Sequence, residues 1–178
     1  MNELKLVLPE TQSENAVHAF KQEFFEYGEP IISGSGLLDQ LSYEEWLAHT
    51  QAYRQAENAQ AAWVPSTTFF ALRKTDQQIV GIIDIRHHID HPLLRSYAGH
   101  IGYAVRPAER RKGYASEMLQ LGLEYAQSLG LKEVMLGCHA ANVGSYRTIE
   151  KQGGVLTEEN VDKEGKRIRI YWIQLEKA

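Results

Sequence analysis

The sequence predicts a single-domain α/β protein of layered α+β type, in which a mixed but mostly antiparallel sheet of about seven strands is flanked by about four helices. Three observations predict this class. Segments rich in β-branched and aromatic residues alternate with amphipathic segments of helical period. Several strand-like segments are separated only by a polar turn, which indicates antiparallel pairing. The 178 residues suffice for one complete hydrophobic core, so we expect one domain over residues 1–178.

The N-terminal part of the chain predicts a strand, two helices and a long loop between the helices. Phe20 and Phe24 lie one turn apart on the apolar face of the first helix, and Gly28 ends it. The second helix begins at the capping box Ser42-Tyr-Glu-Glu45. The loop combines glycines with apolar residues, which is typical of a segment that covers a site. The predicted ranges are 4–8 for the strand, 14–27 for the first helix, 29–39 for the loop, and 42 to about Gln60 for the second helix.

The rest of the chain predicts the remaining strands and two further helices. The polar turn Thr75-Asp-Gln77 separates the two strands of a hairpin, and Gly130 ends the third helix. The turn Asp162-Lys-Glu-Gly165 separates the last two strands. The predicted strands are 67–73, 78–88, 98–105, 132–138, 154–161 and 166–175, and the predicted helices are 115–129 and 142–152.

A basic, glycine-containing turn lies between the predicted strand 98–105 and the helix that follows it. The turn reads Arg110-Arg-Lys-Gly-Tyr-Ala-Ser116. A helix start leaves backbone N–H groups unpaired and carries partial positive charge, so this turn indicates a phosphate or pyrophosphate site. Gly113 allows the backbone to approach a ligand closely. The motifs G-x-G-x-x-G and G-x-x-x-x-G-K-[ST] do not occur, which disfavours a dinucleotide site or a nucleoside-triphosphate loop.

A second motif follows one strand later. Residues 110–115 match [QR]-x-x-G-x-[GA], and residues 142–153 read Asn-Val-Gly-Ser-Tyr-Arg-Thr-Ile-Glu-Lys-Gln-Gly. Together, in this order, they resemble the two signatures of the GNAT superfamily of N-acetyltransferases, and the order of predicted elements extends the resemblance to the whole chain. The resemblance implies a GNAT fold with a splay between the fourth and fifth strands, and acetyl-coenzyme A as co-substrate. The form N-x-x-S-x-x-x-I-E-K-x-G is closest to the branch that acetylates the N-termini of ribosomal proteins.

The resemblance also implies which residues bind the cofactor. Backbone groups of residues 111–115 and the Ser116 hydroxyl would hold the pyrophosphate, while the pantetheine arm would add to the preceding strand. A backbone N–H near Ala104 or Val105 would stabilise the oxyanion. The alternative for the arginine side chains is a solvated surface, and for Asn142 a helix N-cap. The implied cofactor-binding residues are Tyr103, Val105, Arg110, Arg111, Lys112, Gly113, Tyr114, Ala115, Ser116 and Asn142.

The sequence departs from the family where many members carry a tyrosine that protonates the departing thiolate. That position is Ile149, and Tyr146 lies almost one turn earlier, so we expect Tyr146 to be the general acid, with solvent as the alternative. His100 starts the strand beside the acceptor site and is the predicted general base, with a structural histidine as the alternative. Cys138 ends an apolar strand and is interpreted as a buried thiol rather than a nucleophile.

Asp84 and Arg86 alternate along one predicted strand, so they should share a face and orient the acceptor amine. The neighbouring histidines suggest a metal site as an alternative. Because His87 falls on the opposite face and the guanidinium of Arg86 repels cations, we expect no metal. A rim of acidic and aromatic side chains for a cationic amine is predicted from Tyr97, Glu26, Glu29 and Asp39, with ordinary surface as the alternative.

Composition and charge exclude several classes of function. The formal net charge is −4 and basic residues cluster locally, so we expect no nucleic-acid partner. The chain has no membrane-length apolar run or signal-peptide core, and its single cysteine agrees with a reducing compartment, so we expect a cytoplasmic protein without a membrane partner. The predicted function is transfer of an acetyl group to a primary amine by direct attack. The acceptor is left open among a small-molecule amine, such as an antibiotic or polyamine, and a peptide N-terminus; a homodimer is common in the family. The alternative is a catalytically silent acyl-coenzyme A binding or sensing module.

Overall fold

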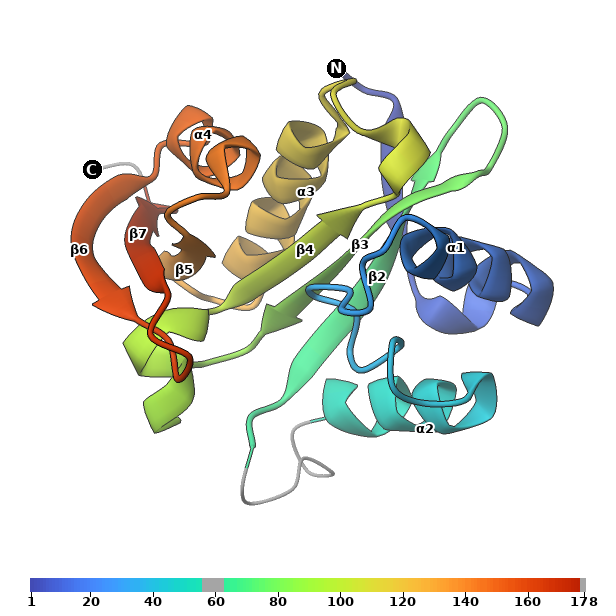
Figure 1. Cartoon of the computed structure of the whole chain (residues 1–178), viewed down its shortest axis with the longest axis horizontal. Helices are drawn as coiled ribbons and strands as arrows, with labels where there is room; N and C mark the ends of the chain where they lie inside the picture. Colours follow the sequence, from blue (N-terminus) through green and yellow to red (C-terminus); the bar gives the residue numbers. More distant parts are fainter. Residues whose placement is uncertain (56–62, 177–178) are drawn as a thin grey trace.

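The structure is a computed structural model that describes residues 1–55 and 63–176. Within these ranges the chain forms seven strands and four α-helices, in the predicted order (Figure 1). The strands are β1 (Leu4–Val7), β2 (Ser66–Arg73), β3 (Ile79–Arg86), β4 (Ile101–Val105), β5 (Glu133–His139), β6 (Val155–Val161) and β7 (Arg167–Gln174). The helices are α1 (Glu14–Glu26), α2 (Tyr43–Arg54), α3 (Tyr114–Ser128) and α4 (Val143–Lys151).

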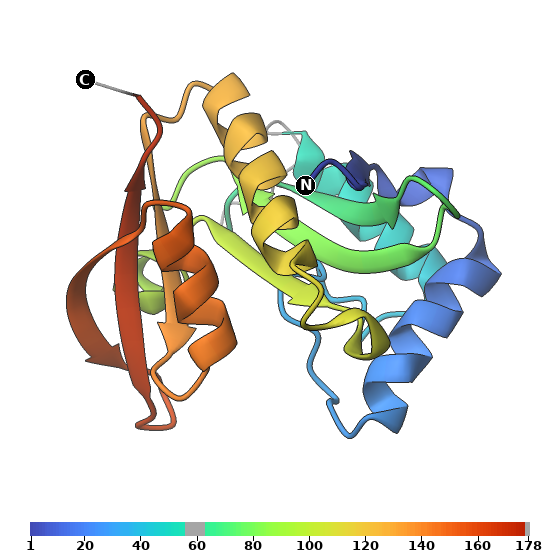
Figure 2. The same ribbon diagram turned by 90° about the horizontal axis from the view of Figure 1, so that it is seen from above.

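The seven strands divide between two antiparallel sheets. The first has the order β1-β2-β3-β4 and the second has the order β5-β7-β6. The sheets meet where Gly99 forms a bridge with Leu136 and the His100 N–H donates to the Met135 carbonyl at 2.8 Å. Beyond this junction β4 and β5 diverge, as Figure 2 shows, and this is the splay expected between the fourth and fifth strands.

Helices cover both faces of the first sheet, with α1 and α2 on one face and α3 on the other (Figures 1 and 2). Because successive strand residues point to opposite faces, Ile82 packs into the cluster with Phe20 and Trp46, whereas Ile83 packs with Met118 of α3. This double covering explains why β3 is apolar and buried along nearly its whole length.

Two predicted boundaries are wrong. Helix α2 ends at Arg54, because Gln55 has an extended backbone with φ −99° and ψ 118°. The rest of the predicted extension to Gln60 lies outside the described residues. Strand β4 begins at Ile101 instead of residue 98, because Leu94–Ala98 form a short π-helical turn that Gly99 ends at φ 67°.

Candidate active site

A cleft of about 710 Å³, which we call the first cleft, opens at the splay. Strand β4 is the edge of the first sheet and pairs with β3 on one side only, so the backbone of Tyr103, Ala104 and Val105 presents its other edge to the cleft. The start of α3 and the first turns of α4 line the opposite side. An extended ligand can therefore add to β4 as a further strand.

The start of α3 forms an anion-binding corner of the first cleft. Gly113 is the N-cap with φ 85° and makes no side-chain cap, so the first N–H groups of the helix remain available to a ligand. Arg111 also has a positive φ, of 63°. Consecutive turns of this kind aim backbone N–H groups at one point. The Ser116 Oγ accepts from Gln152 Nε2 at 2.9 Å, which leaves its own O–H free to donate.

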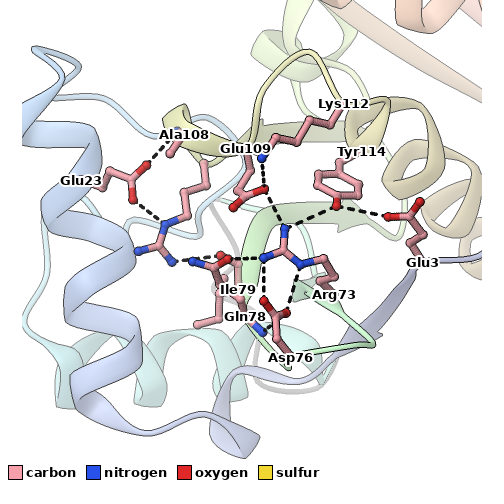
Figure 3. Close-up of polar contacts among 11 residues, drawn as sticks. Glu3, Glu23, Arg73, Asp76, Gln78, Ile79, Ala108, Glu109, Lys112 and Tyr114 are labelled. Carbon is pink, nitrogen blue, oxygen red and sulfur yellow. Dashed lines mark hydrogen bonds and ion pairs between the residues drawn. The ribbon is translucent and has the colours of Figure 1, made fainter.

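A polar network supports this corner from beneath (Figure 3). The buried carboxylate of Glu109 accepts from Arg73 Nη1 at 2.8 Å and from Lys112 Nζ at 2.9 Å. Arg73 also binds Asp76 and donates to the Tyr114 hydroxyl at 3.4 Å. Burial raises the pKa of Glu109, but the hydrogen bonds from Lys112 and Arg73 outweigh it and leave that pKa below its usual value. Lys112 therefore belongs to this network through its hydrogen bond to Glu109, and it does not line the first cleft.

Arg110 joins the turn to the loop 29–39. Its Nη1 and Nη2 donate to the two carboxylate oxygens of Glu29 at 2.8 and 2.7 Å, and its Nε donates to the Val105 carbonyl at 3.0 Å. The hydrogen bonds from Arg110 hold the pKa of Glu29 below its usual value. The guanidinium also lies over the rings of Phe24 and Tyr27. In this structure Arg110 therefore orients the loop.

Unpaired cations reach the first cleft from two elements. Arg111 lines it from the turn, and Arg147 and Lys151 line it from α4. None of the three forms an ion pair within the described ranges 1–55 and 63–176. Sequence reasoning missed the two residues of α4. Their i, i+4 spacing inside the second motif was the available signal, because it places both on one helix face.

A second cleft, of about 460 Å³, lies on the face of the first sheet that α2 covers. Loop residues from Ile31 to Gln40 form one wall, and Ile31 also lines the first cleft, so the two clefts meet there. The loop crosses β4 with backbone against backbone, because a Cβ on Gly34 would lie 2.1 Å from the Gly102 carbonyl oxygen. The other wall includes Asp84, which the β3–β4 register places directly opposite Gly102.

Asp84 and Arg86 share the face of β3 that lines the second cleft. Asp84 is 6% exposed, its Oδ1 accepts from the Thr68 hydroxyl at 2.9 Å, and its Oδ2 lies 3.8 Å from Arg86 Nε. Burial raises the pKa of Asp84 against the opposing charge of Arg86. His87 is on the other face, where its Nε2 lies 2.8 Å from Thr67 Oγ1. In the part of the chain that the structure describes, no three His, Cys, Asp or Glu side chains gather as metal ligands would.

The structure places the predicted acid and base away from both clefts. His100 is 5% exposed, its Nδ1 accepts from the Met135 N–H at 2.9 Å, and burial lowers its pKa to about 4. The ring of Tyr146 lies 4.4 Å from the guanidinium of Arg169 on β7. Neither residue is among the described side chains that line the clefts. These positions do not support the roles predicted for them.

A different tyrosine reaches the first cleft. The hydroxyl of Tyr103 lies 3.1 Å from Ser145 Oγ, at the start of α4, and burial raises its pKa to about 12. Ile149, at the family's tyrosine position, is 1% exposed in the core. Cys138 is also buried, and burial raises the pKa of its thiol. A protonated phenol therefore enters the cleft from β4 instead of α4.

The predicted rim residues do not form one surface. Asp39 lines the second cleft, where its Oδ2 accepts from the Ile32 N–H at 2.7 Å and shapes the loop. Glu29 lines the first cleft. Glu26 is exposed at the end of α1, and Tyr97 packs beside Met135 between the sheets and the π-helical turn.

An unpaired strand edge beside an uncapped helix start suits an extended ligand that carries phosphate groups. The chain belongs to the GNAT acetyltransferase family: residues 6–155 match the acetyltransferase (GNAT) domain. No helix of the described residues is long and apolar enough to cross a membrane.

Individual proteins resemble the chain over different extents. It is 33% identical over 70 residues to YnaD, an uncharacterized N-acetyltransferase of Bacillus subtilis (strain 168), and the match covers 39% of this chain and 41% of YnaD. The ribosomal-protein-S5-alanine acetyltransferase of Vibrio fischeri superposes with a TM-score of 0.71 at 14% identity, covering 97% of this chain and 92% of that one. The putative acetyltransferase YncA of Salmonella typhimurium, solved with its cofactor acetyl-CoA, superposes with a TM-score of 0.64 at 13% identity, covering 99% and 96%. At these identities the two structures show the shared fold.

Proposed function

We propose that this protein transfers an acetyl group from acetyl-coenzyme A to a primary amine by direct attack. The observation that carries the proposal is that the free edge of β4 and the uncapped start of α3 line one cleft, which meets a second cleft at Ile31. One cleft suits the acyl carrier and the other suits the acceptor. Direct attack needs no enzyme nucleophile, in agreement with the buried thiol of Cys138.

The residues present fit the cofactor. The N–H groups of residues 111–116 and the Ser116 hydroxyl would hold the pyrophosphate, and Gly113 leaves the corner free of a side chain. The backbone of Tyr103 to Val105 would pair with the pantetheine arm, and Asn142 lines the same wall. When bound, acetyl-coenzyme A supplies an activated thioester.

Groups of this chain would then act on charge that develops during transfer. The Arg106 N–H donates to the Val80 carbonyl, so by the alternation of the ladder the N–H of Val105 points away from β3, toward the first cleft. There it would stabilise the oxyanion. The Tyr103 hydroxyl, kept protonated by burial, would donate a hydrogen bond toward the leaving sulfur in place of the family tyrosine. Asp84 and Arg86 would orient the acceptor amine in the second cleft.

The carboxylates of the second cleft favour a cationic acceptor. Asp39 and Asp84 line it together with Arg86, so its formal charge is negative when both carboxylates are ionised. A small-molecule amine and a peptide N-terminus both carry the required ammonium group. The neighbour from Vibrio fischeri is named for an alanine of ribosomal protein S5, which supports testing peptides beside small amines.

The test combines calorimetric binding of acetyl-coenzyme A with thiol release over a panel of amines and N-terminal peptides. We expect micromolar binding, thiol release with one class of acceptor, and a raised Michaelis constant for that acceptor in Asp84→Asn. Asp90→Asn, at an exposed carboxylate in the segment after β3, is the matched control for Asp84→Asn. Binding without thiol release for any acceptor would identify the silent module instead, and no binding would remove the cofactor assignment.

A further inference from the structure

Among the seven histidines of the chain, all of them in the described ranges, one lines a cleft. This residue is His49 of α2, which faces the second cleft. The others are engaged or positioned elsewhere: His18 is exposed on α1, His87 binds Thr67, His88 lies near Asp90, His91 stacks on Trp63, His100 is buried, and His139 lies near Asp162. His100, the predicted base, does not line the second cleft, whereas His49 on α2 does.

Neighbouring groups fix the orientation of His49 and set its charge. Its ring stacks on Tyr53, one turn later on α2, with ring centroids 4.4 Å apart. Across the cleft, β3 contributes the buried Asp84 and the cation Arg86, and the covering loop contributes Asp39. These are the titratable and charged groups that share the second cleft with His49.

The surroundings keep the ring neutral and still able to take a proton. Burial lowers the pKa of His49, and the nearby charge of Asp84 opposes that effect without cancelling it. Near neutral pH the ring is thus unprotonated and can accept a proton. Once protonated, it faces a carboxylate that stabilises the imidazolium.

We propose that His49 is the general base that removes the proton from the acceptor amine, and that Asp84 is a positioning residue which stabilises the protonated ring. This inference rests on the proposed function. His49 and Asp84 both line the second cleft, from α2 and from β3. Asp84 pairs with Gly102 of β4, and the next residue of β4, Tyr103, lines the first cleft, so the two side chains lie beside the place where the clefts meet.

The step balances without a further reactant. The amine nitrogen forms a bond to the acetyl carbonyl carbon while the bond from that carbon to sulfur breaks and the sulfur leaves with the electron pair. The acceptor ammonium first loses one proton to the free nitrogen of the His49 ring, which passes it to solvent, and so becomes the attacking amine. After the bond to carbon forms, the nitrogen loses a second proton to solvent, and the thiolate takes one proton from solvent. The ring returns to its neutral form for the next turnover.

The test compares His49→Gln with His18→Gln, a matched change at an exposed histidine. At saturating concentrations of both substrates we expect kcat to fall by about 100-fold or more in His49→Gln and to stay within about twofold in His18→Gln. Because the base works unprotonated, kcat of the wild type should rise with pH through the His49 pKa, below pH 6.5, and His49→Gln should lose this limb. Added imidazole should restore part of the rate of His49→Ala, since a purely structural defect would not respond.

A second measurement, which does not depend on turnover, is the pKa of the His49 ring. In NMR titrations of the ligand-free protein, Asp84→Asn should lower the pKa of His49, because the nearby carboxylate that raises it is removed. His49→Gln with wild-type kcat and acid limb, or an unchanged His49 pKa in Asp84→Asn, would overturn the inference and leave the proposed function standing. Loss of acetyl-coenzyme A binding or of thiol release in the wild type would instead overturn both.

Discussion

Replacing Gly113 by glutamate should abolish tight binding of acetyl-coenzyme A without unfolding the domain. The residue is the N-cap of α3 with φ 85° and ψ 2°, so any L side chain costs about 1–2 kcal/mol of stability there. Gly113→Ala bears the same cost and the same contact of its Cβ with the flexible Met1 side chain, at 2.9 Å from Met1 Cε. The alanine variant is therefore the matched control, and the difference between the two isolates the carboxylate.

The magnitude follows from the charges at this corner. Two like charges about 4 Å apart repel by about 1 kcal/mol in water and about 4 kcal/mol at an effective dielectric constant of about 20. Gly113 is exposed, so we take about 1–2 kcal/mol for each of two phosphate charges. The sum of about 2–4 kcal/mol predicts a dissociation constant about 30- to 1000-fold weaker for Gly113→Glu than for Gly113→Ala.

Calorimetric titration of both variants, with thermal unfolding to verify the fold, measures this difference. The gap between the variants should narrow with added salt, since exposed charges are screened. A folded glutamate variant that binds acetyl-coenzyme A within about threefold of the alanine variant would show that the pyrophosphate does not lie at the start of α3.

Three further changes test other parts of the site. Tyr103→Phe should lower kcat by about tenfold or more with nearly unchanged affinity for acetyl-coenzyme A, whereas Tyr146→Phe should leave kcat within about twofold; the reverse order would return the donor role to α4. Cys138→Ala should keep kcat within about fivefold, because burial raises the pKa of that thiol and no acyl-enzyme is needed, and an acetylated Cys138 formed at the turnover rate in mass spectrometry would contradict this. Glu109→Gln should lower the free energy of unfolding by about 1–3 kcal/mol in denaturant titrations, because the negative charge between its two cationic partners is removed; an equal loss in the exposed Glu124→Gln would assign the effect to surface charge.

The parts of the site that could be predicted from the sequence are local in the chain. The turn from Arg110 to Ser116 combines a strand end, a glycine and a helix start within a few residues, so its backbone geometry follows from its own chemistry. Asp84 and Arg86 share a face because strands alternate strictly. Tyr103 was predicted to contact the cofactor, and the same alternation directs it with Ile101 toward α3.

The parts that could not be predicted depend on contacts between distant segments. The motif alone indicated that Arg110 binds phosphate. In the structure its guanidinium donates two hydrogen bonds to Glu29, which is distant in the sequence, and so orients the loop 29–39. His49 faces the second cleft because α2 packs against β2, the neighbour of β3 in the sheet. His100 precedes β4, and at the junction of the two sheets its ring is buried with Nδ1 accepting from the Met135 N–H, a contact with a distant strand that the sequence does not indicate. The periodicity of a sequence predicts which side chains share one face of a helix or strand, but not which other segment packs against that face.

Where the loop 29–39 crosses β4, Gly34 and Gly102 meet with main-chain atoms alone. A Cβ on Gly34 would overlap the Gly102 carbonyl oxygen at 2.1 Å, and a Cβ on Gly102 would lie 3.2 Å from Gly34, so a side chain at position 34 would displace the loop. The backbone therefore sets the distance between the loop and β4 at this point. Under the proposed function, selection among amines would instead depend on side chains of the opposite wall of the second cleft, which includes Trp63.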